Sequence, residues 1–164
     1  MREKAEAGHN LTNFNKSVIK TRAMLDLFTS SNLYVKVYPD EMEVTYLHDN
    51  LTIRRQAPRK FSSDRMLIAD FHAAEEHLKS IIKEIPTRWR LFQPSHIMLI
   101  QHMADLGGGL CEVEKRTLRD LSEHAGAKAV FIVSHTQPLS TEEAIHKLTM
   151  GLKGRAFMPP DLAT

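Results

Sequence analysis

The run at 112–133, EVEKRTLRDLSEHAGAKAVFIV, constrains the fold of this chain more than any other stretch. It predicts a helix over 113–124, a C-terminal cap at Gly126 and a buried strand at 130–133. The nearly continuous apolar run at 96–103 predicts another strand, one that is covered on both faces. Strands reached through helices are typical of a sheet with helices packed on its faces.

The first half of the chain predicts strands of a different kind. Residues 33–38 are rich in β-forming side chains and end at the turn signal Pro39-Asp40. Alternating apolar residues on both sides of 48–50 predict a hairpin, so three antiparallel strands are expected between 33 and 57. Helical spacing predicts a helix over 72–85, with Asp70 as its cap rather than as a catalytic carboxylate. Ser140 is suited to begin another helix.

The predicted order is therefore β-β-β-α-β-α-β-α behind an N-terminal helix. This order favours an α/β (α+β) fold with a mixed five-stranded sheet. Leu11, Phe14, Val18, Leu25 and Phe28 give the N-terminal helix an apolar stripe. The expected organisation is an amphipathic helix within 1–31, a folded domain at 32–151 and a loose tail at 152–164.

Composition narrows the class of protein. A chain of 164 residues, 42% hydrophobic and 26% charged, suits one globular domain. Its apolar runs are too short for a transmembrane helix, and no secretory signal is visible. The single cysteine, Cys111, cannot form an internal disulfide, so we expect a cytoplasmic protein. A net charge of +2 gives little support for nucleic-acid binding.

Three blocks resemble the bacterial shape protein MreB and its family of actin-like ATPases. Leu67-Ile68-Ala69-Asp70-Phe71 is similar to the family's Val-Ile-Ala-Asp-Phe. The helix and strand at 73–101 follow as they do in the family, and 112–133 completes the match. The resemblance spans roughly 33–150, the whole of one actin subdomain (IA), and implies a ribonuclease H-like, actin-like sheet.

The departures from the family argue against an ATPase. The hairpin at 36–42 lacks the family's Gly-Thr turn, which cradles phosphate, and adds Asp40 and Glu41 instead. Ser134-His135-Thr136 stands where the family has Glu-Glu-Pro, and the second phosphate loop is missing. The resemblance thus implies a pseudo-ATPase without cofactor or metal. We expect a non-catalytic binding or scaffolding module, linked to the cell-shape cytoskeleton.

Two other functions stay open. Ligands of such sheets lie outside the carboxyl ends of the strands, where His102, Asp105 and His135 are expected. These three residues would carry a small hydrolase, or the two histidines are simply exposed loop residues. A basic surface that includes the pairs Arg54-Arg55 and Arg88/Arg90 would instead bind nucleic acid.

An isolated actin-like lobe needs cover for the face that its missing half would occupy. Phe14, Val18 and Leu25 on the N-terminal stripe are the candidate contacts, and Trp89 is a second anchor for a partner. The stripe predicts self-association, or else it packs on its own domain. Membrane binding through this helix would be weak and reversible.

Val18→Asp tests the first of these alternatives. If the stripe faces outward, the wild-type chain self-associates and Val18→Asp separates the subunits without unfolding the sheet. Sedimentation velocity at micromolar concentrations, with far-ultraviolet circular dichroism, measures both properties. A monomeric wild-type chain would exclude self-association. If Val18→Asp then unfolds that monomer, the stripe belongs to the core.

Overall fold

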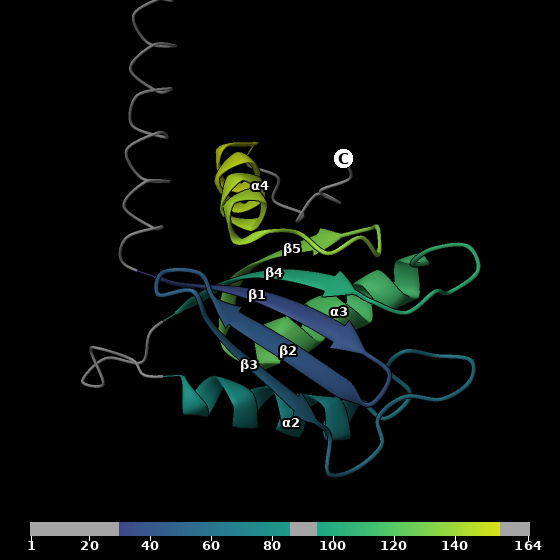
Figure 1. Cartoon of the computed structure of the whole chain (residues 1–164). Coiled ribbons are helices and arrows are strands. Elements are labelled where there is room, and N and C mark those ends of the chain that lie inside the picture. Colours follow the sequence, from purple (N-terminus) through teal and green to yellow (C-terminus); the bar gives the residue numbers. More distant parts are fainter. Residues whose placement is uncertain (1–29, 86–94, 155–164) are drawn as a thin grey trace, which may run out of the picture.

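The computed structural model describes residues 30–85 and 95–154 (Figure 1). Five strands form one sheet: β1 Ser31–Tyr38, β2 Glu41–Tyr46, β3 Leu51–Gln56, β4 His96–His102 and β5 Ala127–Val133. Three helices are α2 Phe71–Glu84, α3 Glu112–His124 and α4 Thr141–Gly154.

The sheet is mixed, with the strand order β3-β2-β1-β4-β5. β1, β2 and β3 form an antiparallel meander, whereas β4 pairs parallel to β1 and β5 pairs parallel to β4. The predicted mixed five-stranded sheet with helices is thus confirmed. β1 begins at Ser31 and α4 ends at Gly154, so both elements extend beyond the predicted domain bounds of 32 and 151. The helix predicted within 1–31 lies outside the described residues.

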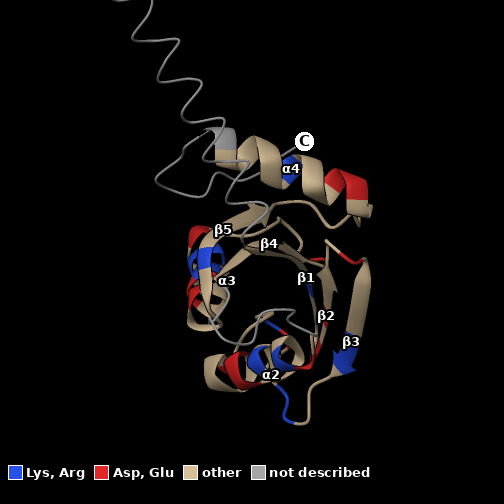
Figure 2. Cartoon of the chain, turned by 90° about the vertical axis from the view of Figure 1, so that its left-hand side faces the viewer, with Lys and Arg blue, Asp and Glu red and all other residues tan. Residues whose placement is uncertain are grey.

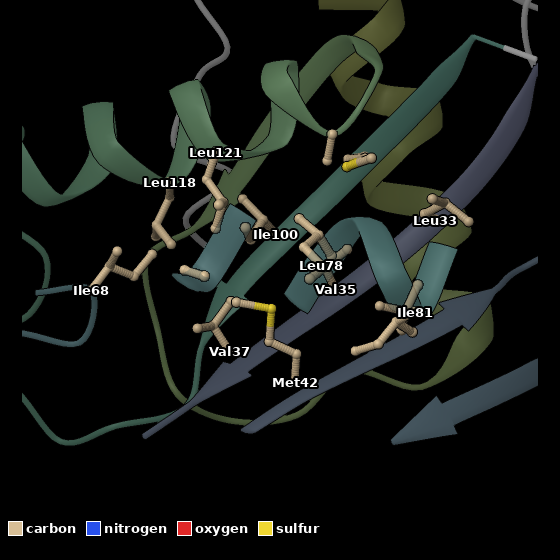
Figure 3. Close-up of a cluster of buried hydrophobic side chains, with 14 of the residues drawn as sticks. Leu33, Val35, Val37, Met42, Ile68, Leu78, Ile81, Ile100, Leu118 and Leu121 are labelled. Carbon is tan, nitrogen blue, oxygen red and sulfur yellow. The ribbon is translucent and has the colours of Figure 1, made fainter. Parts of the chain in front are cut away.

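The larger core lies between the sheet and the pair α2 and α3. Figure 2 shows the sheet curving around these two helices, with α4 on its opposite face. Side chains alternate along a strand, so β1 directs every second residue into this core. Figure 3 shows part of the cluster, which includes Leu33, Val35, Val37, Met42, Leu78, Ile81, Ile100, Leu118 and Leu121.

The smaller core lies beneath α4. It contains Tyr34, Leu47, Ile97, Leu99, Phe131, Val133, Ala144 and Leu148. Gly151 allows close contact in this layer, because a Cβ atom there would lie 2.6 Å from Cε1 of Phe131. Both cores meet at β4, whose seven residues are all buried. The predicted strand covered on both faces is therefore confirmed.

The ends of the helices have the predicted caps. The Asp70 carboxylate accepts a hydrogen bond from the Ala73 amide at 2.9 Å and begins α2. Ser140 and Glu143 form a reciprocal pair at the start of α4, since each side chain accepts from the other's amide. Gly126 follows α3 with φ of 99°, a conformation that glycine adopts without strain.

Salt bridges connect the three strands of the meander on the sheet face that Tyr34 shares. Lys36, Glu43 and Arg54 are neighbours across β1, β2 and β3. Lys36 pairs with Glu43 at 2.7 Å, and Arg54 pairs with Glu41 at 2.6 Å and Glu43 at 3.6 Å. The Arg54 guanidinium also lies 4.5 Å from the centre of the Tyr38 ring. These contacts make this face of the meander polar, in contrast to the apolar face that packs on α2.

A buried polar network connects the sheet to the segment before α4. The Tyr34 hydroxyl donates to Oε1 of Gln101, a residue with no exposed surface, and accepts from the Leu139 amide at 3.1 Å. Gln101 Nε2 donates to the carbonyls of His135 at 2.6 Å and Gln137 at 2.7 Å. Burial raises the pKa of Tyr34 to about 12, so the hydroxyl keeps its proton.

We expect Tyr34→Phe to lower the free energy of unfolding by about 1–3 kcal/mol, because it leaves the Leu139 amide and Gln101 Oε1 without a partner. Urea titration followed by circular dichroism measures the loss. Tyr38→Phe is the matched control, since no hydrogen bond of the Tyr38 hydroxyl occurs within the described part of the chain. Equal losses in the two variants would contradict the role of the network.

Candidate cleft at the carboxyl ends of the parallel strands

The carboxyl ends of β1, β4 and β5 lie at one edge of the sheet because these strands are parallel. β2 and β3 lie on one side of β1 in the sheet, and β4 and β5, which come later in the chain, lie on its other side. Open sheets bind ligands where the direction of the chain reverses in this way. The search for a site therefore begins beside the ends of β1 and β4.

A cleft of about 550 Å³ lies at this place. This volume is within the range of small-molecule sites in proteins. The β1–β2 turn, the segment between β3 and α2, the segment after β4 and the first turn of α3 line it. The lining residues are Pro39, Asp40, Lys60, Ser62, Ser63, Asp64, Arg65, Met66, Leu67, Ala104, Asp105, Leu106 and Glu114.

Asp40 holds two sides of the cleft together. Its Oδ1 accepts hydrogen bonds from the amides of Phe61 and Ser62, both at 2.8 Å. Its own carbonyl accepts from the Ala57 amide at 2.8 Å. Desolvation raises the pKa of the Asp40 carboxyl, but the hydrogen bonds from Ser62 and Phe61 outweigh it and keep that pKa below its usual value. The β1–β2 turn is thus fastened to the segment that follows β3.

Two carboxylates stand on the opposite wall. Asp105 accepts a hydrogen bond from the Gly107 amide at 3.0 Å, and Gly107 has φ of 65° in the turn that follows. Glu114 accepts from the Cys111 amide at 3.0 Å and so caps the start of α3. Each of these bonds uses one of the two oxygens of its carboxylate.

The histidines predicted for a hydrolase have other surroundings. His102 is the last residue of β4 and is buried, so its interpretation as an exposed loop residue is wrong. Its Nδ1 lies 3.1 Å from the Ala104 carbonyl and its Nε2 lies 3.1 Å from the Ser134 carbonyl. Both ring nitrogens therefore face backbone acceptors that the fold itself provides.

His135 and Asp105 do not join this histidine. Nδ1 of His135 lies 3.4 Å from Nε2 of Gln101, in the network beneath α4. Asp105 lines the cleft, and neither histidine does. No hydrogen bond connects Asp105 to His102 or His135 within 30–85 and 95–154. Nor does that part of the chain contain a group of three or more metal-binding side chains.

Two of the four arginines proposed to bind nucleic acid, Arg54 and Arg55, are among the described residues, and both form salt bridges within the fold. Arg54 binds Glu41 and Glu43, as above, and Arg55 binds Glu84 at 2.9 Å. Arg88 and Arg90 lie outside the described residues, as do the candidate contacts Phe14, Val18, Leu25 and Trp89. No helix of the described part has the length and apolar character that crossing a membrane requires.

Sequence reasoning named Asp105 but missed the cleft as a whole. The turn at Pro39-Asp40 is confirmed, and Asp40 adopts φ of 55° there. The role of its carboxylate as a hydrogen-bond acceptor was not predicted, because its partners are 21 and 22 residues away in the chain. Gln101 and Tyr34 were also missed, although a glutamine inside an apolar run indicates a buried polar contact.

Asp40→Gly should destabilise the fold by about 1–3 kcal/mol, since it removes a charged acceptor from two amides. Asn50→Gly is the matched control, since Asn50 also has positive φ (51°). Among the described residues, its side chain accepts a single hydrogen bond, an exposed one from Thr141. Urea denaturation of both variants gives the comparison. If Asn50→Gly lowered the free energy of unfolding as much as Asp40→Gly does, the hydrogen bonds of Asp40 would not be the cause of its loss.

Asp40→Asn tests the charge alone. Because the folded state lowers the pKa of Asp40, the charge stabilises the fold above the unfolded pKa, about 4. This stabilisation is lost as pH falls through the folded pKa. The wild type should therefore exceed Asp40→Asn in stability at pH 7, and the difference should shrink toward pH 3.

Comparisons with known proteins add one relative. No family model matches the chain. The chain is 30% identical over 95 residues to a protein of Escherichia coli (strain K12) described as uncharacterized protein YjaA. The match covers 56% of this chain and 73% of the Escherichia coli protein.

Proposed function

The chain belongs to the YjaA family, and we propose that it is a non-catalytic protein-binding module built like one lobe of an actin-like ATPase. The hydrogen bonds of Asp40 are the observation that carries this proposal. The turn that contains Asp40 corresponds to the phosphate-binding turn of MreB. In this protein the amides of Phe61 and Ser62 bind that turn.

The order of elements supports the relationship to the actin-like group. Three antiparallel strands precede a helix, a strand, a helix, a strand and a final helix, the order used by the actin, Hsp70 and ribonuclease H group. The MreB-like block at 67–71 runs into α2 through the Asp70 cap, as its position in the family implies. The MreB-like run at 112–133 covers the whole of α3 and β5.

The β1–β2 turn argues against phosphate binding. A phosphate-binding turn presents backbone N–H groups to the ligand and uses glycine to let the backbone approach it. Pro39 has no N–H group, and Asp40 brings a carboxylate whose lowered pKa keeps it ionised at neutral pH. The Asp40 carboxylate would repel a phosphate placed here. The phosphate would also displace the hydrogen bonds between Asp40 and the amides of Phe61 and Ser62.

The hydrolase alternative has no support in the described geometry. A general base needs a nitrogen that can take a proton from the substrate or a nucleophile. Both nitrogens of His102 face backbone carbonyls. The His135 ring lies outside the cleft that contains Asp105. Binding without chemistry therefore accounts better for this arrangement.

ATP with Mg²⁺ should leave the melting temperature unchanged. A ligand at a hundred times its dissociation constant adds about 2.7 kcal/mol to stability. In a domain of this size that gain raises the melting temperature by roughly 5–10 °C. Differential scanning fluorimetry with 5 mM ATP and Mg²⁺ measures the shift, and the same salt without nucleotide is the control. A clear rise would overturn the pseudo-ATPase proposal.

A further inference from the structure

We propose that the cleft beside Asp105 and Glu114 binds a short basic and apolar segment of a partner protein. This inference rests on the proposed function, since it names the kind of partner that the binding module takes. It uses two adjoining hollows, the charges on their walls and the exposed apolar side chain of Met66, which lines both.

The cleft continues into an apolar notch. The notch lies between the segment before α2 and the first turns of α3, and Met66, Leu67 and Glu114 line both hollows. Ile68, Leu110, Thr117 and Leu118 complete its wall. The notch itself has room for about one water molecule (10 Å³), so a larger side chain would enter only if Met66 moved aside. One continuous groove thus has a roomy polar end and a narrow apolar end.

The polar end carries an excess of negative charge. Asp40, Asp64, Asp105 and Glu114 line it together with Lys60 and Arg65, four carboxylates against two cations. Both cations belong to the wall at 60–66. On the opposite wall, the charged residues in the lining are the carboxylates Asp105 and Glu114. An arginine or lysine side chain lying along that opposite wall would meet two carboxylates, each with an oxygen not used in its turn or cap.

The apolar end has an exposed apolar side chain in its wall, because Met66 is 42% exposed. Burying this side chain would favour a partner residue such as leucine or methionine beside the cation. The groove therefore selects basic and apolar residues that follow one another, which is a pattern for an extended segment rather than a small ion.

A phosphorylated or acidic partner fits this groove less well. The amino end of α3 would attract an anion through the helix dipole, but Glu112 and Glu114 already occupy its first turn. A phosphate near Lys60 or Arg65 would also meet Asp64 on the same wall and Asp40, whose carboxylate binds the Ser62 amide of that wall. An acidic peptide is accordingly the counter-probe in the test below.

Three fluorescein-labelled peptides serve as probes in fluorescence anisotropy: GRLRLG, its acidic analogue GELELG and its polar analogue GRSRSG. GRLRLG should bind most tightly. Two-dimensional amide NMR of the full chain then locates the contact. Shifts should concentrate at 62–67, 104–110 and 113–118, and the amides of α4 should stay in place.

A charge-neutral variant isolates the acidic walls. Asp64→Asn, Asp105→Asn and Glu114→Gln, made together, remove three charges and keep the acceptors for Gly107 and Cys111. Asp49→Asn, Glu123→Gln and Glu142→Gln make the same charge change at exposed positions that do not line the groove. The groove variant should bind GRLRLG on the order of tenfold more weakly, and the control variant should bind it as the wild type does.

The apolar end has its own variant. Met66→Ser should bring the affinity for GRLRLG down to that for GRSRSG. The Met66 side chain is exposed, so the fold should tolerate the change.

Three results would overturn the inference. They are tighter binding of GELELG, equal weakening in the groove and control variants, and NMR shifts confined to residues outside the groove. Each leaves the nucleotide result unaffected. A rise in melting temperature with ATP would instead refute the proposed function, whatever the peptides do.

Discussion

The desolvation of β4 is the constraint from which most of this structure follows. All seven of its residues are buried, so both faces of the sheet need a helical cover at its centre. α2 and α3 provide that cover on one face and α4 provides it on the other. A strand buried in this way also has to satisfy every polar side chain that it carries.

β4 carries three such residues whose partners come from its surroundings. His96 contacts the Ser31 hydroxyl, Gln101 binds Tyr34 and the segment before α4, and His102 lies between two carbonyls. Burial lowers the pKa of His96, which favours its neutral form. Gln101 and His102 hold the segments that follow β4 and β5 in place. The polar groups of one strand thereby position the loops at the carboxyl edge of the sheet, where the cleft opens.

The sequence predicted what depends on neighbours in the chain. The apolar runs at 96–103 and 130–133 and the caps at Asp70 and Ser140 were visible in short windows, and the order of the elements predicted the mixed sheet. Contacts between distant segments were not visible. The surroundings of His102 depend on Ser134, and those of Asp40 depend on Phe61 and Ser62. A pattern of residue types does not show which carbonyl or amide a polar side chain will meet across the fold.

The position of β3 has a consequence for how the molecule behaves at high concentration. β3 is an edge strand, and nearly all of it is exposed. Arg54 and Arg55 point to opposite faces of the sheet, and each holds a carboxylate from a neighbouring element. A strand from another molecule that added to this edge would have to desolvate these ion pairs on both of its sides. Such an edge resists the open-ended strand addition that leads to fibrils, and it does so without a covering helix or a proline.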